Sequence, residues 1–561
     1  MQPVLEIKNL NIGFLHNGLS QPVAEDISFI LNRGETTALV GESGSGKSVT
    51  ALSILQLLPK QSLVTGKIIY NQDNTGAFNL LDLPGTEMRS LRGNKIAMIF
   101  QEPMTSLNPV YTCGYQVMEA LLQHKKITRK EARKQTLDLF EMVELPDPSS
   151  MLNRYPHQIS GGQKQRVMIA MAMSCQPDIL IADEPTTALD VRVQANILKL
   201  LADLQKKTGM AILFITHDLG IVADFANNVA VLNKGKIVEQ GHTLTFLQKP
   251  QHPYTKALLA CRPAAGAKGQ RLALVSDFMS EGHSESETLT INRAPLSDEV
   301  VLSVRNLIVQ FPVKTNLFGT PTSYFKAVDN VSFNVRKNEI IGLVGESGCG
   351  KTTLGRTILQ LIKPTSGEIF LGGKDITHLS PAQLRIERKN LQIIFQDPYG
   401  SLNPRLSIGT AISEALGVHG IANTKKQQQE KVVSLLESVN LQADHFNRYP
   451  HQFSGGQRQR ICIARALALD PSFLVFDESV SALDVSVQAQ VLNLINQLRE
   501  SLDFTAIFIS HDLSVVHYIS DQIMVMQKGK IVENGPAAQV YNDPQNTYTR
   551  ALIQAIPGKA L

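Results

Sequence analysis

Apolar and polar positions follow the same order twice along this chain of 561 residues. Short, continuously apolar runs are typical of strands buried on both faces, and longer helix-like stretches lie between them. Each half opens on a stretch of alternating apolar and polar residues, which is typical of a half-exposed strand. The buried-strand runs are Ile179–Ala182, Ile212–Ile215, Phe473–Phe476 and Ile507–Ile509, the long helix-like stretches are Val191–Lys207 and Val485–Leu502, and the opening strands are Leu5–Phe14 and Leu302–Phe311. This alternation predicts an α/β fold in each half.

The second half repeats the motifs of the first. Matched motif residues lie 294 to 304 residues apart, and the offset changes only where loops differ in length. The first copy has an insertion near Asn71–Leu83, and the second has one near Thr315–Tyr324. Between the copies lies a stretch rich in Gly, Ser and Glu and poor in aromatic residues, which predicts a flexible linker. We therefore expect two domains, 1–264 and 301–561, joined by a linker over 265–300.

A glycine-rich loop follows an apolar strand in each copy. The two loops, LVGESGSGKS at 39–48 and LVGESGCGKT at 343–352, both fit G-x-x-x-x-G-K-[ST]. Glycines let backbone N–H groups turn inward as an anion-binding nest, and the following helix directs its N-terminus at the same anion. The predicted flanking elements are strands Thr36–Val40 and Glu339–Val344 and helices Val49–Leu58 and Thr353–Ile362. The residues expected to contact nucleotide are Gly41, Glu42, Ser43, Gly44, Ser45, Gly46, Lys47, Ser48 and Val49, and Gly345, Glu346, Ser347, Gly348, Cys349, Gly350, Lys351, Thr352 and Thr353.

Polar side chains stand at the ends of several predicted buried strands, the edge where α/β proteins bind ligands. A lone glutamine or histidine in such a place is more often structural, but recurrence beside the glycine-rich loops favours a site. Hydroxyl, amide and carboxylate oxygens suit Mg²⁺, and a second carboxylate with a histidine suits activation of water. The candidate Mg²⁺ ligands are Ser48, Gln101 and Asp183 with Thr352, Gln396 and Asp477, and the candidate catalytic residues are Glu184, Glu478, His217 and His511.

A second glycine-containing loop, SGGQ, precedes a helical run in each copy. Its residues are Ser160, Gly161, Gly162 and Gln163, and Ser454, Gly455, Gly456 and Gln457. A serine N-cap with two glycines leaves N–H donors for an anion, although an ordinary helix cap would look the same. Because one phosphate cluster needs only one cradle, we infer that each SGGQ loop closes over nucleotide held by the other copy. Asp190 and Asp484, in the turns that follow, are candidates for contact between the copies.

Aromatic residues end the two opening strands. Phe14 and Phe311 are candidates for stacking on adenine, and a place in the core is nearly as plausible an interpretation. About residues 112–152 and 407–446, the sequence is helix-like and rich in Leu, Lys and Glu. We read these two regions as helical lobes.

The composition limits the remaining possibilities. The net charge of +4 argues neither for nor against nucleic acid, and five scattered cysteines suit free thiols in a reducing compartment. The first residues lack the features of a signal peptide, and no apolar run approaches ~18 residues. We expect a soluble or peripheral protein of the cytoplasm.

The ordered set of phosphate loop, glutamine, SGGQ, Asp-Glu and histidine resembles the ATP-binding domain of ABC transporters, twice over. Longer sequence words resemble those of the oligopeptide, dipeptide and nickel importer ATPases. The fusion of two domains in one chain is similar to subunits for import of glutathione or microcin C-type peptides. These words are FQEPMTSLNP (100–109), FQDPYGSLNP (395–404), RYPHQISGGQ, RYPHQFSGGQ, DVSVQAQ (484–490) and HPYTKALL (252–259).

The resemblance implies two tandem P-loop NTPase domains, each a RecA-like α/β core with an antiparallel β part and a helical lobe. It implies an ATPase that uses ATP and Mg²⁺ and energises import of peptides or peptide-like solutes. The expected partners are two integral-membrane permease subunits and an extracytoplasmic binding protein, without nucleic acid. The expected location is the cytoplasmic face of the inner membrane, as a peripheral subunit.

Three departures from the family pattern stand out. Many relatives place a cysteine cluster after the PYT motif, whereas here only Cys261 is near the first motif and none follows the second, so we expect no iron–sulfur cluster. Ser479 stands where the first copy has Pro185, which removes a fixed φ from that turn. Cys349 replaces Ser45; it is either a small space-filler or a thiol whose pKa is lowered by an electropositive nest.

Two other functions compete with transport. A tandem ATPase without a permease, acting on ribosomes or damaged DNA, would pair similar domains, but no basic–aromatic patch stands out here. A purely regulatory nucleotide sensor is disfavoured because Glu184 and Glu478 are both present.

Overall fold

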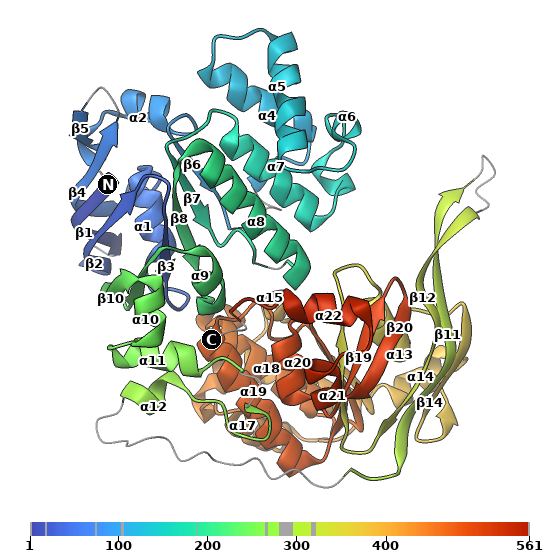
Figure 1. The fold of residues 1–561 in the computed structure, drawn as a ribbon. Helices are drawn as coiled ribbons and strands as arrows, with labels where there is room; N and C mark the ends of the chain where they lie inside the picture. Colours follow the sequence, from blue (N-terminus) through green and yellow to red (C-terminus); the bar gives the residue numbers. More distant parts are fainter. Residues whose placement is uncertain are drawn as a thin grey trace. The chain divides into compact units, whose positions relative to one another are not determined.

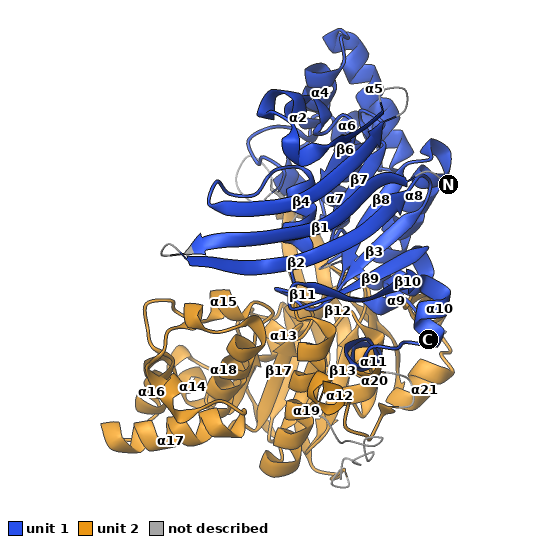
Figure 2. Cartoon of the chain, turned by 90° about the vertical axis from the view of Figure 1, so that its left-hand side faces the viewer, with its two compact units in different colours: residues 1–259, 557–561 blue, residues 260–556 orange. Residues whose placement is uncertain are grey.

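The computed structural model divides the chain into two compact units. Unit 1 comprises residues 1–259 and 557–561, and unit 2 comprises residues 260–556 (Figures 1 and 2). The structure describes residues 3–16, 19–72, 76–101, 106–187, 189–263, 267–279, 296–315 and 321–558.

Each unit contains a six-stranded core sheet and a four-stranded antiparallel sheet. In unit 1 the core order is β10-β9-β3-β8-β7-β6, with all neighbours parallel except β10 and β9, and the second sheet is β2-β1-β4-β5. The strands of unit 1 are β1 (Pro3–His16), β2 (Leu19–Asn32), β3 (Thr36–Val40), β4 (Ser62–Gln72), β5 (Gly76–Asn79), β6 (Ile96–Ile99), β7 (Ile179–Asp183), β8 (Ala211–Thr216), β9 (Asn228–Asn233) and β10 (Lys236–His242).

Unit 2 repeats this topology. Its sheets have the orders β16-β17-β18-β13-β19-β20 and β12-β11-β14-β15. The strands are β11 (Val300–Thr315), β12 (Pro321–Arg336), β13 (Ile340–Val344), β14 (Ser366–Leu371), β15 (Lys374–Asp375), β16 (Leu391–Ile394), β17 (Phe473–Asp477), β18 (Thr505–Ile509), β19 (Gln522–Gln527) and β20 (Lys530–Pro536). The α/β repeat predicted from the sequence is confirmed.

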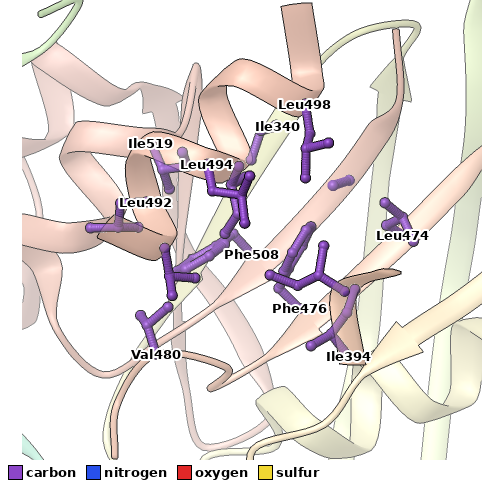
Figure 3. Packing of buried hydrophobic residues seen from close by; sticks show 14 of the residues in the cluster. Ile340, Ile394, Leu474, Phe476, Val480, Leu492, Leu494, Leu498, Phe508 and Ile519 are labelled. Atoms are coloured by element: carbon purple, nitrogen blue, oxygen red, sulfur yellow. The ribbon is translucent and has the colours of Figure 1, made fainter. Parts of the chain in front are cut away.

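The buried strands alternate between two cores, which explains why their sequences are continuously apolar. One cluster lies on the side of the antiparallel sheet, and the other lies on the side of the helices. In β7 and β8, Ile179, Ile181, Leu213 and Ile215 belong to the first cluster, and Leu180, Ala182, Ile212 and Phe214 belong to the second. Figure 3 shows the helix-side cluster of unit 2, where Phe476 and Phe508 pack with Leu494 and Leu498 of helix α19 (Val485–Leu502).

Helices surround the core sheets and form the predicted lobes. In unit 1 they are α1 (Lys47–Ile54), α2 (Gly85–Leu91), α4 (Cys113–His124), α5 (Arg129–Met142), α6 (Pro148–Met151), α7 (Gly161–Met173), α8 (Val191–Thr208), α9 (Leu219–Phe225), α10 (Thr243–Gln248) and α11 (Pro253–Ala260). In unit 2 they are α12 (Val275–Met279), α13 (Lys351–Ile358), α14 (Pro381–Glu387), α15 (Pro398–Ser401), α16 (Ile408–Val418), α17 (Lys425–Ser438), α18 (Gly455–Leu467), α19, α20 (Leu513–Ile519), α21 (Ala537–Asn542) and α22 (Thr547–Gln554).

The described residues that follow α11 pack against unit 2, where the composition had predicted a flexible linker. Cys261 and Leu272 are buried in the helix-side cluster of unit 2. The side chain of Asn493 accepts the N–H of Leu272 and donates to its carbonyl, both at 2.9 Å. Tyr518 donates its hydroxyl to the carbonyl of Gln270 at 2.9 Å. Within the predicted linker, residues 265–266 and 280–295 lie outside the described residues.

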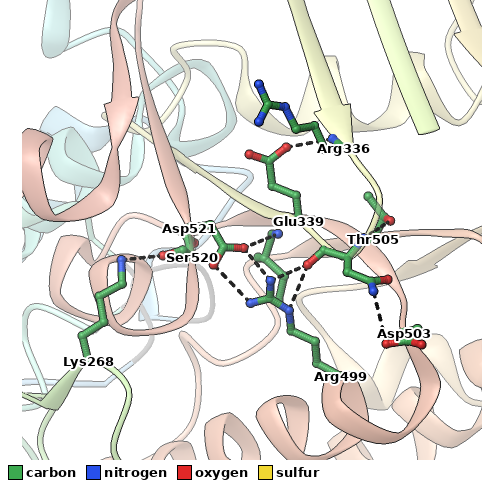
Figure 4. A network of polar contacts seen from close by, with 10 residues as sticks. Lys268, Arg336, Glu339, Arg499, Asp503, Thr505, Ser520 and Asp521 are labelled. Carbon is green, nitrogen blue, oxygen red and sulfur yellow. Dashed lines mark hydrogen bonds and ion pairs between the residues drawn. The ribbon is translucent and has the colours of Figure 1, made fainter. Parts of the chain in front are cut away.

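A buried ion pair also stabilises unit 2. Arg499 donates to Asp521 at 2.6 Å and also to the carbonyl of Asn338, so both partners have hydrogen bonds that offset their desolvation. Next to this pair, Lys268 donates to the carbonyl of Ser520 at 2.9 Å (Figure 4). In unit 1, which also includes residues 557–561, the N–H of Gly558 donates to Asp224 at 2.8 Å.

Candidate nucleotide-binding sites

The two glycine-rich loops form the tight turns that the motif predicts. Gly44 and Gly46 have φ of 80° and 104°, in the left-handed region that favours glycine. A Cβ at Gly41 would lie 2.2 Å from the carbonyl oxygen of Leu232, so a side chain does not fit there. The loop leads into helix α1, which begins at Lys47, the residue before Ser48 of the motif. The second copy has the same geometry, with φ of 78° at Gly348 and 112° at Gly350.

The lysine of each loop is buried and bonded to the loop itself. Lys47 donates to the carbonyls of Gly41 and Glu42 at 2.8 and 2.7 Å. Lys351 donates to the carbonyls of Gly345 and Glu346 at 2.7 and 3.0 Å. The ammonium group of each lysine is therefore held by two carbonyls of its own loop.

The hydroxyl residue of each loop meets the first carboxylate after the buried strand. Ser48 donates to Asp183 at 3.1 Å, and Thr352 donates to Asp477 at 2.9 Å. Burial raises the pKa of Asp183 to about 6, although its hydrogen bond from Ser48 lowers it. Burial likewise raises the pKa of Asp477. These carboxylates stand where a cation would stabilise their charged form.

The second carboxylate binds the glutamine that ends the edge strand. Gln101 Nε2 donates to Glu184 Oε2 at 3.1 Å, and Gln396 Nε2 donates to Glu478 Oε2 at 3.0 Å. The structure thus brings together residues that are more than eighty positions apart in the sequence. Each set lies at the carboxyl ends of parallel strands, as the sequence predicted.

Each predicted histidine lies beside this second carboxylate. His217 Nδ1 is 3.4 Å from Glu184 Oε1, and His511 Nδ1 is 3.6 Å from Glu478 Oε2. Burial alone would raise the pKa of Glu184, but the hydrogen bond and charge of His217 outweigh it and lower that pKa to about 2. The pKa of His217 is raised, because Glu184 outweighs the effect of burial. The pKa of Glu478 is lowered for the same reason, by His511.

The backbone at both glutamates is strained. Glu184 has φ of 46° and Glu478 has φ of 50°, in the left-handed region where a non-glycine residue costs about 1–2 kcal/mol. A hydrogen bond across the sheet fixes each conformation: the N–H of Glu184 donates to Ile215, and that of Glu478 to Ile509, both at 3.0 Å. Strain of this kind is typical of functional positions.

The SGGQ loops begin helices α7 and α18 as capping boxes. Gln163 N–H donates to Ser160 Oγ at 3.3 Å, while Ser160 N–H donates to Gln163 Oε1 at 3.0 Å. Ser454 and Gln457 form the same pair of bonds. The second glycine permits close packing, because a Cβ at Gly162 would lie 2.8 Å from Val193 of α8. Both serines nevertheless remain exposed, so the cap leaves this helix end accessible.

Other candidates have local roles that the structure defines. Asp190 and Asp484 cap α8 and α19, accepting N–H groups at 3.0 and 2.9 Å. Phe311 is 39% exposed on β11, and Phe14 is half-buried on β1, so neither belongs to a core cluster. Cys349 is buried, and burial raises the pKa of its thiol. A lowered thiol pKa, one of the two interpretations of Cys349, is therefore wrong, and the space-filling interpretation holds.

Two contacts of these sites escaped the sequence analysis. Thr187 donates to Glu184 Oε2 at 2.9 Å, whereas the matching Ser481 donates to the backbone carbonyl of Glu478 at 2.8 Å. The hydroxyls of Tyr254 and Tyr548 accept the backbone N–H of Glu42 and Glu346, both at 3.1 Å. The repeated PYT and TYT words were the only signal for these tyrosines.

The comparisons with known proteins agree with this geometry. The model of the ABC transporter family matches residues 24–187 and 328–481, which together exceed half of the chain. The chain belongs to the ABC transporter family. A second model, of the oligopeptide/dipeptide transporter C-terminal region, matches residues 238–280 and 532–559. The two matched domains make the chain an ATPase.

Curated relatives match over almost the whole length. Glutathione import ATP-binding protein GsiA of Escherichia coli O157:H7 and of Escherichia coli strain K12 are each 47% identical over 99% of this chain and 89% of the relative. The protein of the same name from Pectobacterium atrosepticum is 45% identical over the same shares. Among solved structures, the dimeric bacterial ABC transporter cassette MJ0796 is 26% identical, covering 42% of this chain and 98% of its own, with a TM-score of 0.38.

With these import ATP-binding relatives, the chain is an ATPase subunit of an importer that works with membrane permeases. In the ranges that the structure describes, no helix combines the length and the apolar character needed to cross a bilayer.

Proposed function

We propose that this ABC ATPase energises import of peptides or peptide-like solutes of the glutathione class. The observation that carries the proposal is 47% identity to the glutathione import ATP-binding proteins over 99% of the chain, with a complete residue set in both nucleotide sites. Its partners would be two permease subunits and an extracytoplasmic binding protein, and it would work at the cytoplasmic face of the inner membrane. The matched C-terminal region of oligopeptide/dipeptide transporters supports this over a tandem ATPase that acts on ribosomes or nucleic acid.

Two composite ATP sites would do the work. Phosphates would lie in the glycine-rich nests against Lys47 or Lys351, with adenine stacked on Phe14 or Phe311. The first site would join Lys47, Ser48, Gln101, Asp183, Glu184 and His217 to the Ser454 loop, and the second would join Lys351, Thr352, Gln396, Asp477, Glu478 and His511 to the Ser160 loop. Support comes from the two nests and from the exposed serine caps, each of which offers helix N–H groups to an anion.

The hydroxyl and carboxylate of each site fit Mg²⁺. The hydroxyl of Ser48 and the carboxylate of Asp183 lie 3.1 Å apart, and the raised pKa of Asp183 indicates a buried charge in need of a counterion. Thr352 and Asp477 have the same arrangement in the second copy. When bound, Mg²⁺ would neutralise charge that develops on the β- and γ-phosphates. Gln101 and Gln396 are the proposed further ligands, reached by a change of side-chain rotamer.

Glu184 and Glu478 would orient and polarise the attacking water. The pKa of Glu184 is lowered to about 2, so its carboxylate is ionised throughout the physiological range and suits a hydrogen-bond acceptor for water. Its low basicity disfavours complete proton transfer in the described geometry. His217 and His511 would hold the carboxylate and donate to the γ-phosphate. Binding of two ATP would close the copies, and hydrolysis would reopen them and drive the permeases through the helical lobes.

The proposal is tested by reconstitution with the cognate permeases and binding protein in vesicles. ATPase activity should rise several-fold with the transported solute, and glutathione, tripeptides and Ni²⁺ are the probes. Uptake driven by glutathione or by short peptides supports the proposal. Stimulation by Ni²⁺ alone, or association with ribosomes without any stimulation by permease, would contradict it.

A further inference from the structure

A tyrosine from the C-terminal region contacts the glycine-rich loop in both units. In unit 1, the N–H of Glu42 donates to the hydroxyl of Tyr254 on α11 at 3.1 Å. In unit 2, the N–H of Glu346 donates to the hydroxyl of Tyr548 on α22 at 3.1 Å. Both tyrosines are almost fully buried, at 1% and 6% exposure, and both lie in the regions that match the oligopeptide/dipeptide transporter C-terminal model. The contact therefore joins a part specific to this class of transporter to the general nucleotide site.

The bonded N–H belongs to the peptide group whose carbonyl holds the lysine. The peptide between Gly41 and Glu42 presents its oxygen to Lys47 Nζ at 2.8 Å and its N–H to Tyr254. Because a peptide group is planar, fixing both ends fixes its orientation. In unit 2 the peptide between Gly345 and Glu346 is held at both ends in the same way, by Lys351 and Tyr548.

The helices that carry the tyrosines are themselves anchored to the core sheet. Glu239 of β10 accepts the N–H groups of Gln251 and His252, at 2.8 and 3.0 Å, just before α11 begins. Glu533 of β20 accepts the matching N–H groups of Gln545 and Asn546, at 2.7 and 3.2 Å. Two N–H bonds to one carboxylate fix the start of each helix, and hence the depth at which its tyrosine meets the loop.

We propose that Tyr254 and Tyr548 are positioning residues of the two ATP sites. Each hydroxyl orients the first peptide of the glycine-rich loop, so that the loop is preorganised for phosphate and its lysine is correctly placed. The C-terminal region thereby sets the ATP affinity of its own unit. This inference rests on the proposed nucleotide sites and adds to each a residue that acts through the backbone of the glycine-rich loop.

The test measures ATP affinity one site at a time in the full-length chain. A K351A background reports the first site, and a K47A background reports the second. Y254F, which keeps the ring and removes the acceptor, should weaken binding of a fluorescent ATP analogue at the first site three- to tenfold, as expected for the loss of one hydrogen bond. Y548F should do the same at the second site only. In the otherwise unmodified chain, each variant should raise KM for ATP and leave kcat within about twofold.

Matched controls separate positioning from general stability. Y70F in unit 1 removes a buried hydroxyl that donates to Asp178 at 2.5 Å, and Y541F in unit 2 alters a buried tyrosine that stacks on His517. Both should leave ATP affinity unchanged even if they lower the melting temperature. E239Q, which weakens the anchor of α11, should reduce affinity at the first site less than Y254F does. Hydrogen exchange of the segment 39–46 should accelerate in Y254F and not in Y70F.

The outcomes distinguish this inference from the proposed sites. If K47A and K351A do not alter nucleotide binding, the assignment of the sites themselves fails. If those lysine variants abolish binding while folded Y254F and Y548F bind ATP like the unmodified chain, only the positioning role is overturned. Equal losses in Y254F and Y70F would also overturn it, because a purely structural effect would then suffice.

Discussion

Asn493 binds the backbone of Leu272 through both atoms of its amide group, as a neighbouring strand would. This pair ties the segment that follows α11 to helix α19, and Leu272 is 3% exposed. The segment is therefore a structural part of unit 2 and completes its core.

Replacing Asn493 with alanine should release this segment. Two buried backbone groups of Leu272 would lose their partners, which costs about 2–4 kcal/mol. We expect trypsin to cleave after Arg271 at least tenfold faster in N493A, measured by mass spectrometry of a limited digest. K199A is the control, because Lys199 is the matching, exposed position of α8. An unchanged cleavage rate would show that the segment is held by other contacts.

Removing the charge of either glutamate should reduce ATP turnover. E184Q and E478Q each keep the shape of the side chain but weaken its attraction for a water proton, so each should lower steady-state ATPase by at least half, and the double variant by about a hundredfold or more. E141Q, at an exposed position of α5, is the control. If one single variant turns over ATP at the original rate, the two sites are not equivalent.

Thr187 and Ser481 should have different effects although they occupy matching positions. T187V removes a hydrogen bond to the carboxylate of Glu184, whereas S481A removes one to a backbone carbonyl. We expect T187V to lower turnover at the first site two- to fivefold, read in the E478Q background. S481A in the E184Q background should stay within experimental error of its parent. Equal effects would mean that the different hydrogen bonds of Thr187 and Ser481 do not influence catalysis.

The composite sites predict which pairs of substitutions act together. In a K47A chain, the remaining site would use Lys351 with the Ser160 loop. Adding S160R should therefore abolish the residual ATPase and trapping of nucleotide at that site, whereas adding S454R should have little further effect. The reversed pattern would show that each unit forms its whole site alone.

The thiol of Cys349 should react slowly with alkylating reagents, and its reaction should become faster as the pH rises. Its pKa is raised by burial, with Lys351 acting in the opposite direction, so the reactive thiolate is scarce at pH 8 and increases as the pH rises. We expect iodoacetamide to label it about tenfold more slowly than an exposed cysteine, and ATP to protect it. Complete labelling should block nucleotide at the second site only. C349S should bind ATP normally, because the first copy has Ser45 at this position.

The sequence predicted the elements that repeat a strong pattern. The predicted helices 191–207 and 485–502 correspond to α8 and α19, and the predicted strand 36–40 is β3. The residue clusters at the strand ends were predictable because parallel strands bring their carboxyl ends to one edge. The helices after the glycine-rich loops begin two residues earlier than predicted and end four earlier, because the lysine already belongs to the first turn.

Other features depend on contacts that local sequence does not encode. Tyr254 meets Glu42 across 212 residues, and nothing in the word PYT reveals that partner. The segment after α11 looks like a linker by composition, since only Leu272 and its apolar neighbours indicate burial. The left-handed backbone at Glu184 was also unpredictable, because glutamate has no preference for that region.

Because of the left-handed backbone at Glu184 and Glu478, stability and activity favour different residues at these two positions. Glycine or asparagine at residue 184 or 478 would relax the main chain, since these residues tolerate a positive φ. Selection for heat resistance alone would therefore enrich substitutions there, and those clones would fold well while losing transport. Laboratory evolution of this ATPase needs a growth-coupled screen to keep both glutamates in place.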